Sequence, residues 1–278
     1  MEEEWGLVRL VRHFIIPLAK RHAWRTFCEI GASKGETTDE MLNLPNISYT
    51  ILDPCFDADL GLKYRNDRRV TVHKGNSLDV LPKLEGIFDC ILIDGDHNWY
   101  TVLNELRVIR QRGMLRRGGM IFFHDVGWPY ARRDLYYQPE TIPPECRQEY
   151  ERKGIVRGRS ELVNSWGTNP QVCNSTHEGG PRNGVLTAIE DFIAEHPTDY
   201  NFSRVRYEFG LGVLQYRQGR ASEDASFKLL QMKAGFLSLY SLSPPGILRV
   251  LKHTYLGNLL KQAVRGNPHM DPRTGGNR

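Results

Sequence analysis

The chain has 278 residues, of which 40% are apolar and 25% are charged, and its formal net charge is +4. This composition is typical of a soluble globular protein and excludes a chain that is disordered throughout. No run of about 18 uncharged apolar residues occurs, which argues against a helix that spans a membrane. The first residues are acidic, whereas a secretory signal begins with basic residues, so we expect a cytoplasmic protein.

The positive charge is concentrated near the C-terminal end, where residues 217–278 hold ten Lys or Arg and three Asp or Glu. A nucleic-acid-binding domain would carry its basic residues on the folded part, so no nucleic-acid partner is expected. The five cysteines are widely spaced and include no Cys-x-x-Cys pair, which predicts reduced thiols. Cys28 and Cys90 lie inside apolar runs and are expected in the core.

The order of the predicted elements indicates an α/β fold. The spacing of apolar residues predicts a leading helix over residues 4–21. Strands are predicted at residues 25–30, 48–52, 70–73, 88–93 and 120–124. Helices are predicted between them at residues 37–44, 77–84 and 100–115, with Gly118-Gly119 ending the last one. Apolar strands that alternate with helices predict a doubly wound, mostly parallel sheet.

The later part of the chain adds an edge to this sheet. Residues 184–196 predict another helix, and residues 205–209 and 213–216 predict an antiparallel hairpin at the sheet edge. The expected organisation is an N-terminal helix at 1–22, a catalytic domain at 23–217 with an insertion at 127–183, a basic helical extension at 218–266 and a disordered tail at 267–278. The extension has apolar residues on one face and Lys and Arg on the other, and we expect it to pack on the core or form a homodimer contact and not to adsorb to a membrane.

A glycine-containing loop follows the first strand, where open α/β sheets bind nucleotide-like ligands. Gly31 and Gly35 have the spacing Gly-x-x-x-Gly, and neither Gly-x-Gly-x-x-Gly nor Gly-Lys-Ser/Thr is present, which disfavours a phosphate ligand. Glu29 would repel phosphate but suits an ammonium group. Asp53 ends the second strand about twenty residues later, a position from which a carboxylate binds ribose hydroxyls. A plain tight turn is the alternative interpretation of this loop.

These motifs resemble those of the class I S-adenosylmethionine-dependent methyltransferases. Glu29-x-Gly31-x-x-x-Gly35, Asp53, Gly75-Asn76-Ser77 and the strand 88–94 occur in the order found in that family. The resemblance extends over residues 24–126, and over 184–217 in architecture alone. It implies a Rossmann-like sheet, S-adenosylmethionine as cofactor, Asp53 on the ribose and Asn76 or Ser77 beside the adenine. The implied cofactor contacts are Glu29, Gly31, Ala32, Ser33, Gly35, Asp53, Asn76, Ser77 and Asp94.

A second group of polar residues follows the fourth and fifth strands. Asp94, His97, His124 and Asp125 should meet at one edge, because neighbouring parallel strands end side by side. Carboxylates with imidazoles suit a divalent metal, and the alternative is an Asp that caps a helix and bonds a His. Asp-Gly-Asp-His is similar to a subgroup of metal-dependent O-methyltransferases that act on sugars and phenols. That resemblance implies His97 as general base, with Asp94 catalytic, and Asp94, His124 and Asp125 as ligands of Mg or Mn; His124 stands where the subgroup has an acidic residue.

The resulting hypothesis is an O-methyltransferase that modifies a hydroxyl of a small sugar or phenolic natural product. The insertion would supply a lid and an acceptor pocket, because it is rich in aromatic and Arg residues. Expected acceptor contacts are Trp99, Trp128, Tyr130, Arg132 and Arg133. The alternative for these aromatics is to anchor a solvated loop. The alternative functions are a hydroxylase-like relative that acts on an antibiotic and a non-catalytic cofactor-binding module.

Overall fold

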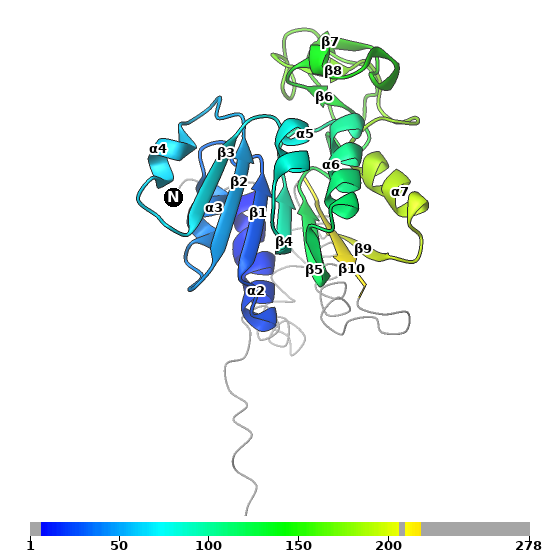
Figure 1. The fold of residues 1–278 in the computed structure, drawn as a ribbon. Helices are drawn as coiled ribbons and strands as arrows, with labels where there is room; N and C mark the ends of the chain where they lie inside the picture. The colour runs from blue at the N-terminus through cyan, green and yellow to red at the C-terminus, as the bar shows by residue number, and fades with distance from the viewer. Residues whose placement is uncertain (1–6, 206–208, 218–278) are drawn as a thin grey trace, which may run out of the picture.

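The computed structural model describes residues 7–205 and 209–217. A seven-stranded sheet forms its centre, in the order β3-β2-β1-β4-β5-β10-β9 (Figure 1). Its strands are β1 (Thr26–Ile30), β2 (Ser48–Asp53), β3 (Val70–Lys74), β4 (Phe88–Ile93), β5 (Leu115–Phe123), β9 (Tyr200–Val205) and β10 (Leu211–Tyr216). The first five strands pair in parallel, and β10 pairs antiparallel with both β5 and β9. The predicted doubly wound, Rossmann-like sheet with an antiparallel edge hairpin is confirmed.

Helices cover both faces of the sheet (Figure 1). They are α1 (Leu7–Leu10), a π-helical turn (Val11–Ile15), α2 (Ile16–His22), α3 (Glu36–Met41), α4 (Leu60–Tyr64), α5 (Ser77–Val80), a 3-10 turn (Leu81–Lys83), α6 (Trp99–Gln111) and α7 (Val185–Glu195). Successive side chains of a strand point to opposite faces. Phe27 accordingly packs in the core with the N-terminal helices, and Cys28 packs in the core with α6 and α7. Cys28 and Cys90 are fully buried free thiols, as predicted.

Several predicted boundaries are wrong. The helix predicted to reach residue 115 ends at Gln111, because Gly113 takes a left-handed φ of +64° and turns the chain. Gly118-Gly119 lies inside β5, where the register with β4 shifts and where a Cβ on Gly119 would come within 2.8 Å of two carbonyl oxygens. The first strand of the hairpin begins at Tyr200 instead of residue 205. The helix α4 was not predicted.

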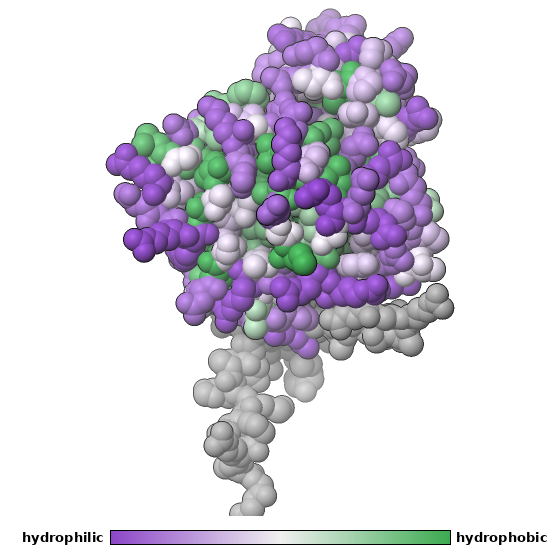
Figure 2. All heavy atoms as spheres, in the orientation of Figure 1, coloured by the Kyte–Doolittle hydropathy of each residue, from purple (hydrophilic) through white to green (hydrophobic). Residues whose placement is uncertain are grey.

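The insertion folds as a second small sheet and is not an irregular loop. It contains β6 (Leu135–Tyr136), β7 (Tyr150–Arg152), β8 (Cys173–Ser175) and two 3-10 turns (Pro139–Thr141 and Pro144–Cys146), with β8 antiparallel to both neighbours. Figure 1 shows it beyond the ends of α5 and α6, and Figure 2 shows that hydrophilic side chains cover most of its surface in this view. A lid function stays a prediction.

The predicted basic segments within 218–266, the tail at 267–278 and the first six residues lie outside the described residues. Within the described part of the chain, no helix is both long enough and apolar enough to cross a bilayer.

The carboxylate of Asp134 joins the insertion to the main sheet. Asp134 is fully buried, and its Oδ1 accepts the backbone N–H groups of Trp99 at 2.7 Å and Gly184 at 2.6 Å. Its Oδ2 accepts the hydroxyl of Tyr136 at 2.7 Å. One side chain therefore connects the start of α6, the start of α7 and the strand β6.

Asp134→Ala should lower the free energy of unfolding by about 2 to 5 kcal/mol, because it leaves two buried N–H groups without an acceptor. Asp134→Asn should be much milder, since its amide oxygen can still accept both bonds. Urea denaturation of the three proteins measures this difference. Similar losses in both variants would contradict the role given to Oδ1.

Asp134 should also make stability depend on pH. Burial raises its pKa to about 7 in the folded protein, above its ordinary value of 3.8. The folded state therefore binds the proton more tightly, so this contribution to stability is complete below pH 3.8 and is lost as pH rises to about 7. The fall in unfolding free energy over that range should be smaller in Asp134→Asn, and an identical fall would contradict the assignment.

Candidate active site

The glycine loop after β1 is fixed by a close approach to the loop after β4. Gly31 has a φ of +82°, and a Cβ there would lie 2.3 Å from Cα of Gly95 and 2.5 Å from the carbonyl oxygen of Asp94. Gly35 precedes α3 with a φ of +83°, and a Cβ there would lie 2.3 Å from the hydroxyl of Tyr64. The fold itself requires both glycines, and their predicted contact with a cofactor stays a prediction.

Asp53 holds this loop from the end of β2. It is 6% exposed, and its Oδ2 accepts the backbone N–H groups of Ala32 at 2.8 Å and Ser33 at 3.0 Å. Its Oδ1 accepts the N–H group of Cys55 at 2.5 Å. The structure therefore brings Asp53 and the glycine loop together, as the sequence predicted, and assigns the carboxylate a structural role that the sequence did not predict.

Glu29 lies in the interior between β1, β2 and α3. Its Oε2 accepts the hydroxyls of Thr38 at 2.5 Å and Tyr49 at 2.9 Å, while Oε1 has no hydrogen-bond partner among the described residues. Burial raises the pKa of Glu29 to about 8. At neutral pH the carboxyl is therefore protonated and carries no negative charge to attract an ammonium group. The predicted contact of Glu29 with a cofactor stays a prediction.

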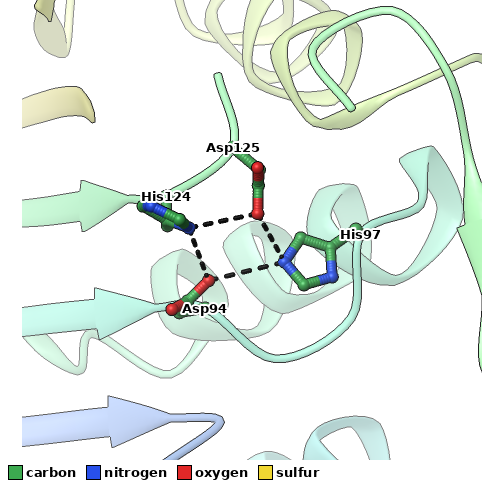
Figure 3. A group of neighbouring side chains, drawn as sticks. All are labelled: Asp94, His97, His124 and Asp125. Atoms are coloured by element: carbon green, nitrogen blue, oxygen red, sulfur yellow. Dashed lines mark hydrogen bonds and ion pairs between the residues drawn. The ribbon is translucent and has the colours of Figure 1, made fainter. Parts of the chain in front are cut away.

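Four side chains converge at the carboxyl ends of β4 and β5 (Figure 3). Nε2 of His97 lies 2.8 Å from Oδ2 of Asp125 and 3.4 Å from Oδ1 of Asp94. Nδ1 of His124 lies 3.1 Å from each of the same two oxygens. We call these four residues the acid–imidazole cluster. All four residues meet at this edge as predicted, and His97 is an equal member of the cluster.

The cluster alternates acidic and basic groups. Burial disfavours a charge on His97, but Asp125 and Asp94 outweigh it and raise the pKa of His97 to about 10. The same carboxylates raise the pKa of His124, and the imidazoles lower the pKa of Asp94 and Asp125 against the effect of burial. Without a metal, two imidazolium ions would therefore balance two carboxylates. Asp125 also has a φ of +56°, an unfavourable backbone conformation of the kind found at functional sites.

The four donor atoms fit a single cation. They all lie within 4.8 Å of one another, and their adjacent separations run from 2.8 to 3.4 Å. Adjacent ligands at about 2.1 Å from one ion would be roughly 3 Å apart, so little rearrangement would be needed. Two imidazole nitrogens favour a borderline transition metal over the harder Mg²⁺.

Of the other predicted contact residues, some lie at the cluster and some lie away from it. Tyr130 contacts the cluster, with its ring 5.6 Å from that of His97. Trp128 is covered instead by the guanidinium of Arg157 at 4.8 Å. Asn76 is exposed at the start of α5, and the hydroxyl of Ser77 bonds Glu105.

Three of the residues predicted to contact the methyl acceptor bind other side chains or backbone groups of the protein. The indole of Trp99 donates to Asp191 on α7 at 2.7 Å. Arg132 forms a bidentate pair with Glu190. Arg133 is fully buried and donates to the backbone carbonyls of Ser175 and Ser160. The Trp99 bond joins α6 to α7, and the bonds of Arg132 and Arg133 attach the insertion to α7 and hold its loops. That these three residues contact the methyl acceptor stays a prediction.

Sequence reasoning missed three residues of this region. Tyr137 is 56% exposed with its ring 6.0 Å from His97, and the ring of Phe209 lies 5.7 Å from His124. Both approach through tertiary contacts that no local pattern reveals. Glu105 left a readable signal, because a charged residue occupies the apolar face of α6 between Val102 and Ile109.

Comparison with known proteins identifies the domain. Residues 28–126 match the model of a family described as a methyltransferase domain. No curated protein matched the sequence. The chain therefore carries a methyltransferase domain on a Rossmann-like sheet, and the predicted enzyme class, a methyltransferase, is confirmed.

Several solved structures are similar to this chain at low sequence identity. A methyltransferase from Podospora anserina with SAH bound has a TM-score of 0.46 at 18% identity, covering 74% of this chain and 77% of its own. A cofactor-bound protein from MTB has a TM-score of 0.47 at 17% identity, with 79% and 84% covered. An O-methyltransferase family protein from Burkholderia thailandensis has a TM-score of 0.44 at 16% identity, with 76% and 57% covered. These values describe similarity of fold alone.

The close approach at Gly31 can be tested against a glycine of similar backbone conformation. Gly31→Ala should strongly lower the thermal midpoint, because its Cβ would meet backbone atoms of the loop after β4. Gly113→Ala is the matched control, since its φ is +64° and a Cβ there would meet nothing within 4 Å. It should lose only about 1 kcal/mol for the left-handed conformation. Equal falls of the thermal midpoint in the two variants would show that the close approach of the two loops does not restrict the side chain at position 31.

Proposed function

We propose that this protein is an S-adenosylmethionine-dependent O-methyltransferase that modifies a hydroxyl of a small molecule. The observation that carries the proposal is the contact between Gly31 and the backbone of Asp94 and Gly95. A methyl donor held along the glycine loop would lie beside the acid–imidazole cluster. The match of residues 28–126 to a methyltransferase domain supports the same chemistry.

The reaction needs alignment and the removal of a proton. The sulfonium is already a strong electrophile, so the enzyme must bring the acceptor oxygen, the methyl carbon and the sulfur into line. The acceptor hydroxyl must also lose its proton. We assign the role of general base to His97. Its ring lies beside the exposed side chain of Tyr137, where an acceptor can approach, whereas the ring of His124 packs against Phe209.

A divalent metal, Mn or a similar ion more than Mg, fits this assignment. Asp94, His124 and Asp125 would hold it, and the lone pair on Nε2 of His97 would stay free to accept the proton. When bound, a divalent cation supplies positive charge that lowers the pKa of a hydroxyl beside it. Without such a charge His97 would keep its own proton, because the two carboxylates raise its pKa to about 10. The proposal therefore links the base role of His97 to a cation at the cluster.

Aromatic side chains suggest the kind of acceptor. Tyr130, Tyr137 and Phe209 surround the imidazoles of the cluster. Flat apolar surfaces of this kind bind phenolic rings or the apolar face of a sugar. We propose a small natural product of one of these types as substrate, a cytoplasmic location, no nucleic-acid partner and a homodimer.

Calorimetry with SAH, the demethylated product of the donor, tests the cofactor. We expect one site per chain, and Asp53→Ala should weaken binding by at least about tenfold, because it removes the acceptor that holds the loop. Glu85→Ala, on an exposed residue between the 3-10 turn and β4, is the control. No affinity of the wild-type protein for SAH would end the proposal.

Once an acceptor molecule is identified, mass spectrometry of the product separates the two reactions. A product heavier by one CH2 supports methyl transfer, and one heavier by an oxygen atom supports the hydroxylase-like alternative.

Thermal denaturation with added metal tests the cluster. Mn²⁺ should raise the thermal midpoint more than Mg²⁺ at equal concentration, because a ligand that binds the folded state stabilises it. His124→Ala and Asp125→Asn should abolish the shift. His13→Ala, on an exposed histidine of the N-terminal helical segment, should retain it. A wild-type protein that responds equally to both ions, or to neither, would refute the metal assignment.

A further inference from the structure

Arg157 lies at a tight turn of the insertion. The N–H group of Arg159 donates to the carbonyl of Val156 at 3.1 Å and closes the turn. Gly158 has a left-handed φ of +83°, which suits the third residue of a β-turn. The side chain of Arg157 is exposed. The turn therefore presents a permanent positive charge on a backbone with a defined conformation.

The segment that carries this turn is attached beside the acid–imidazole cluster. Ile155 and Thr168 exchange two backbone hydrogen bonds, at 3.0 and 2.9 Å, and Ile155 is buried in one apolar cluster with Tyr130. Nδ2 of Asn169 donates to the hydroxyl of Tyr130 at 2.6 Å. Because the ring of Tyr130 lies 5.6 Å from that of His97, these contacts hold the segment next to the proposed general base.

Arg157 contacts an aromatic ring and is otherwise unpaired. Its guanidinium lies 4.8 Å from the centroid of the Trp128 ring, and it forms no ion pair or hydrogen bond with any described residue. Arg147 and Arg182 of the insertion also stack on aromatic rings, but each donates to a backbone carbonyl as well. Nε1 of Trp128 is buried and has no hydrogen-bond partner within the described part of the chain. Donors on both side chains of the Arg157–Trp128 pair are therefore unpaired within the protein.

An aromatic surface connects this pair to the cluster. Trp128 follows Asp125 by three residues and packs against the apolar cluster that contains Tyr130. The surface therefore begins at His97, continues over Tyr130 and Trp128, and ends at Arg157. A flat acceptor on this surface, with its hydroxyl at His97, would extend its other end toward the guanidinium.

A guanidinium in this position suits a carboxylate. It is charged at every physiological pH, and its planar fork can donate two parallel hydrogen bonds to the two oxygens of a carboxylate. Stacking on the indole already limits the rotation of the Arg157 side chain, so less conformational freedom is lost when a ligand binds. A neutral group at the same place would gain no comparable ion pair.

We propose that Arg157 binds a carboxylate of the methyl acceptor, so that the substrate is a small hydroxylated aromatic acid, and that Trp128 is a positioning residue for Arg157. This inference rests on the proposed function, because it assumes that an acceptor places its hydroxyl at His97. It goes further by assigning the charge of the substrate to one residue. Arg132 and Arg133 are already paired elsewhere, whereas Arg157 is free to take this role among the described residues.

Calorimetry with acids and their neutral esters tests the inference. The protein is saturated with SAH and Mn²⁺ at neutral pH and titrated with two probes, para-hydroxybenzoate and para-hydroxycinnamate, and with the methyl ester of each. The two acids differ in the separation of hydroxyl and carboxylate, and each ester keeps the ring of its acid without the charge. The wild-type protein should prefer at least one acid over its ester by about fivefold or more.

Two variants locate the preference. Arg157→Gln removes the charge and should lower the preference to about twofold or less, while its affinity for SAH stays unchanged. Arg159→Gln is the matched control, because it removes the same charge from an exposed residue of the same turn and should keep the wild-type preference. Both side chains are exposed, so we expect both variants to fold.

The outcomes separate this inference from the proposed function. If the wild-type protein does not bind SAH, the proposed function fails. If SAH binds but neither acid is preferred over its ester, the role of Arg157 is overturned while the proposed function stands. The role is also overturned if Arg157→Gln retains the full preference, or if Arg159→Gln loses as much of it, since the preference would then reflect the overall charge of the insertion.

Discussion

The contact between two loops at the carboxyl edge of the sheet determines the arrangement of the whole site. Gly31 after β1 and Gly95 after β4 approach so closely that a Cβ on Gly31 would overlap the opposite backbone. β1 and β4 are neighbours at the point where the strand order reverses, which is where open α/β sheets bind their ligands. Since Asp94 belongs to the second loop, the same contact places the cluster next to the predicted cofactor loop.

Buried polar groups in this protein connect elements that are distant in sequence. Asp53 joins β2 to the glycine loop, and Asp134 joins α6, α7 and the insertion. The N–H group of Leu135 donates to the carbonyl of His97 at 3.0 Å, which attaches the small sheet directly to the cluster. Such groups are stable in the interior only with partners. These hydrogen bonds consequently fix the position of the insertion relative to the acid–imidazole cluster.

The sequence predicted the sheet because its strands are short, apolar and separated by helical patterns. The meeting of Asp94, His124 and Asp125 was predictable as well, because parallel neighbouring strands end at the same edge. Other features depend on tertiary context. The end of α6 was predicted at Gly118-Gly119, whereas Gly113 turns the chain directly after α6. Arg132 and Arg133 were predicted to contact the methyl acceptor, but they bind α7 and the insertion, and no local pattern reveals these partners. His97 was predicted at the same edge, but the separations of 2.8 to 3.4 Å between the four donor atoms required side-chain geometry.

The central claim is that the methyl donor lies beside the acid–imidazole cluster. Nuclear magnetic resonance of S-adenosylmethionine carrying a ¹³C-labelled methyl group, bound to the protein with Mn²⁺, tests this most directly. We expect strong paramagnetic broadening of the methyl signal, and we expect the broadening to disappear in Asp125→Asn while the donor remains bound. A methyl signal that Mn²⁺ leaves unchanged in the wild-type complex, with both ligands shown to be bound, would place the donor away from the cluster.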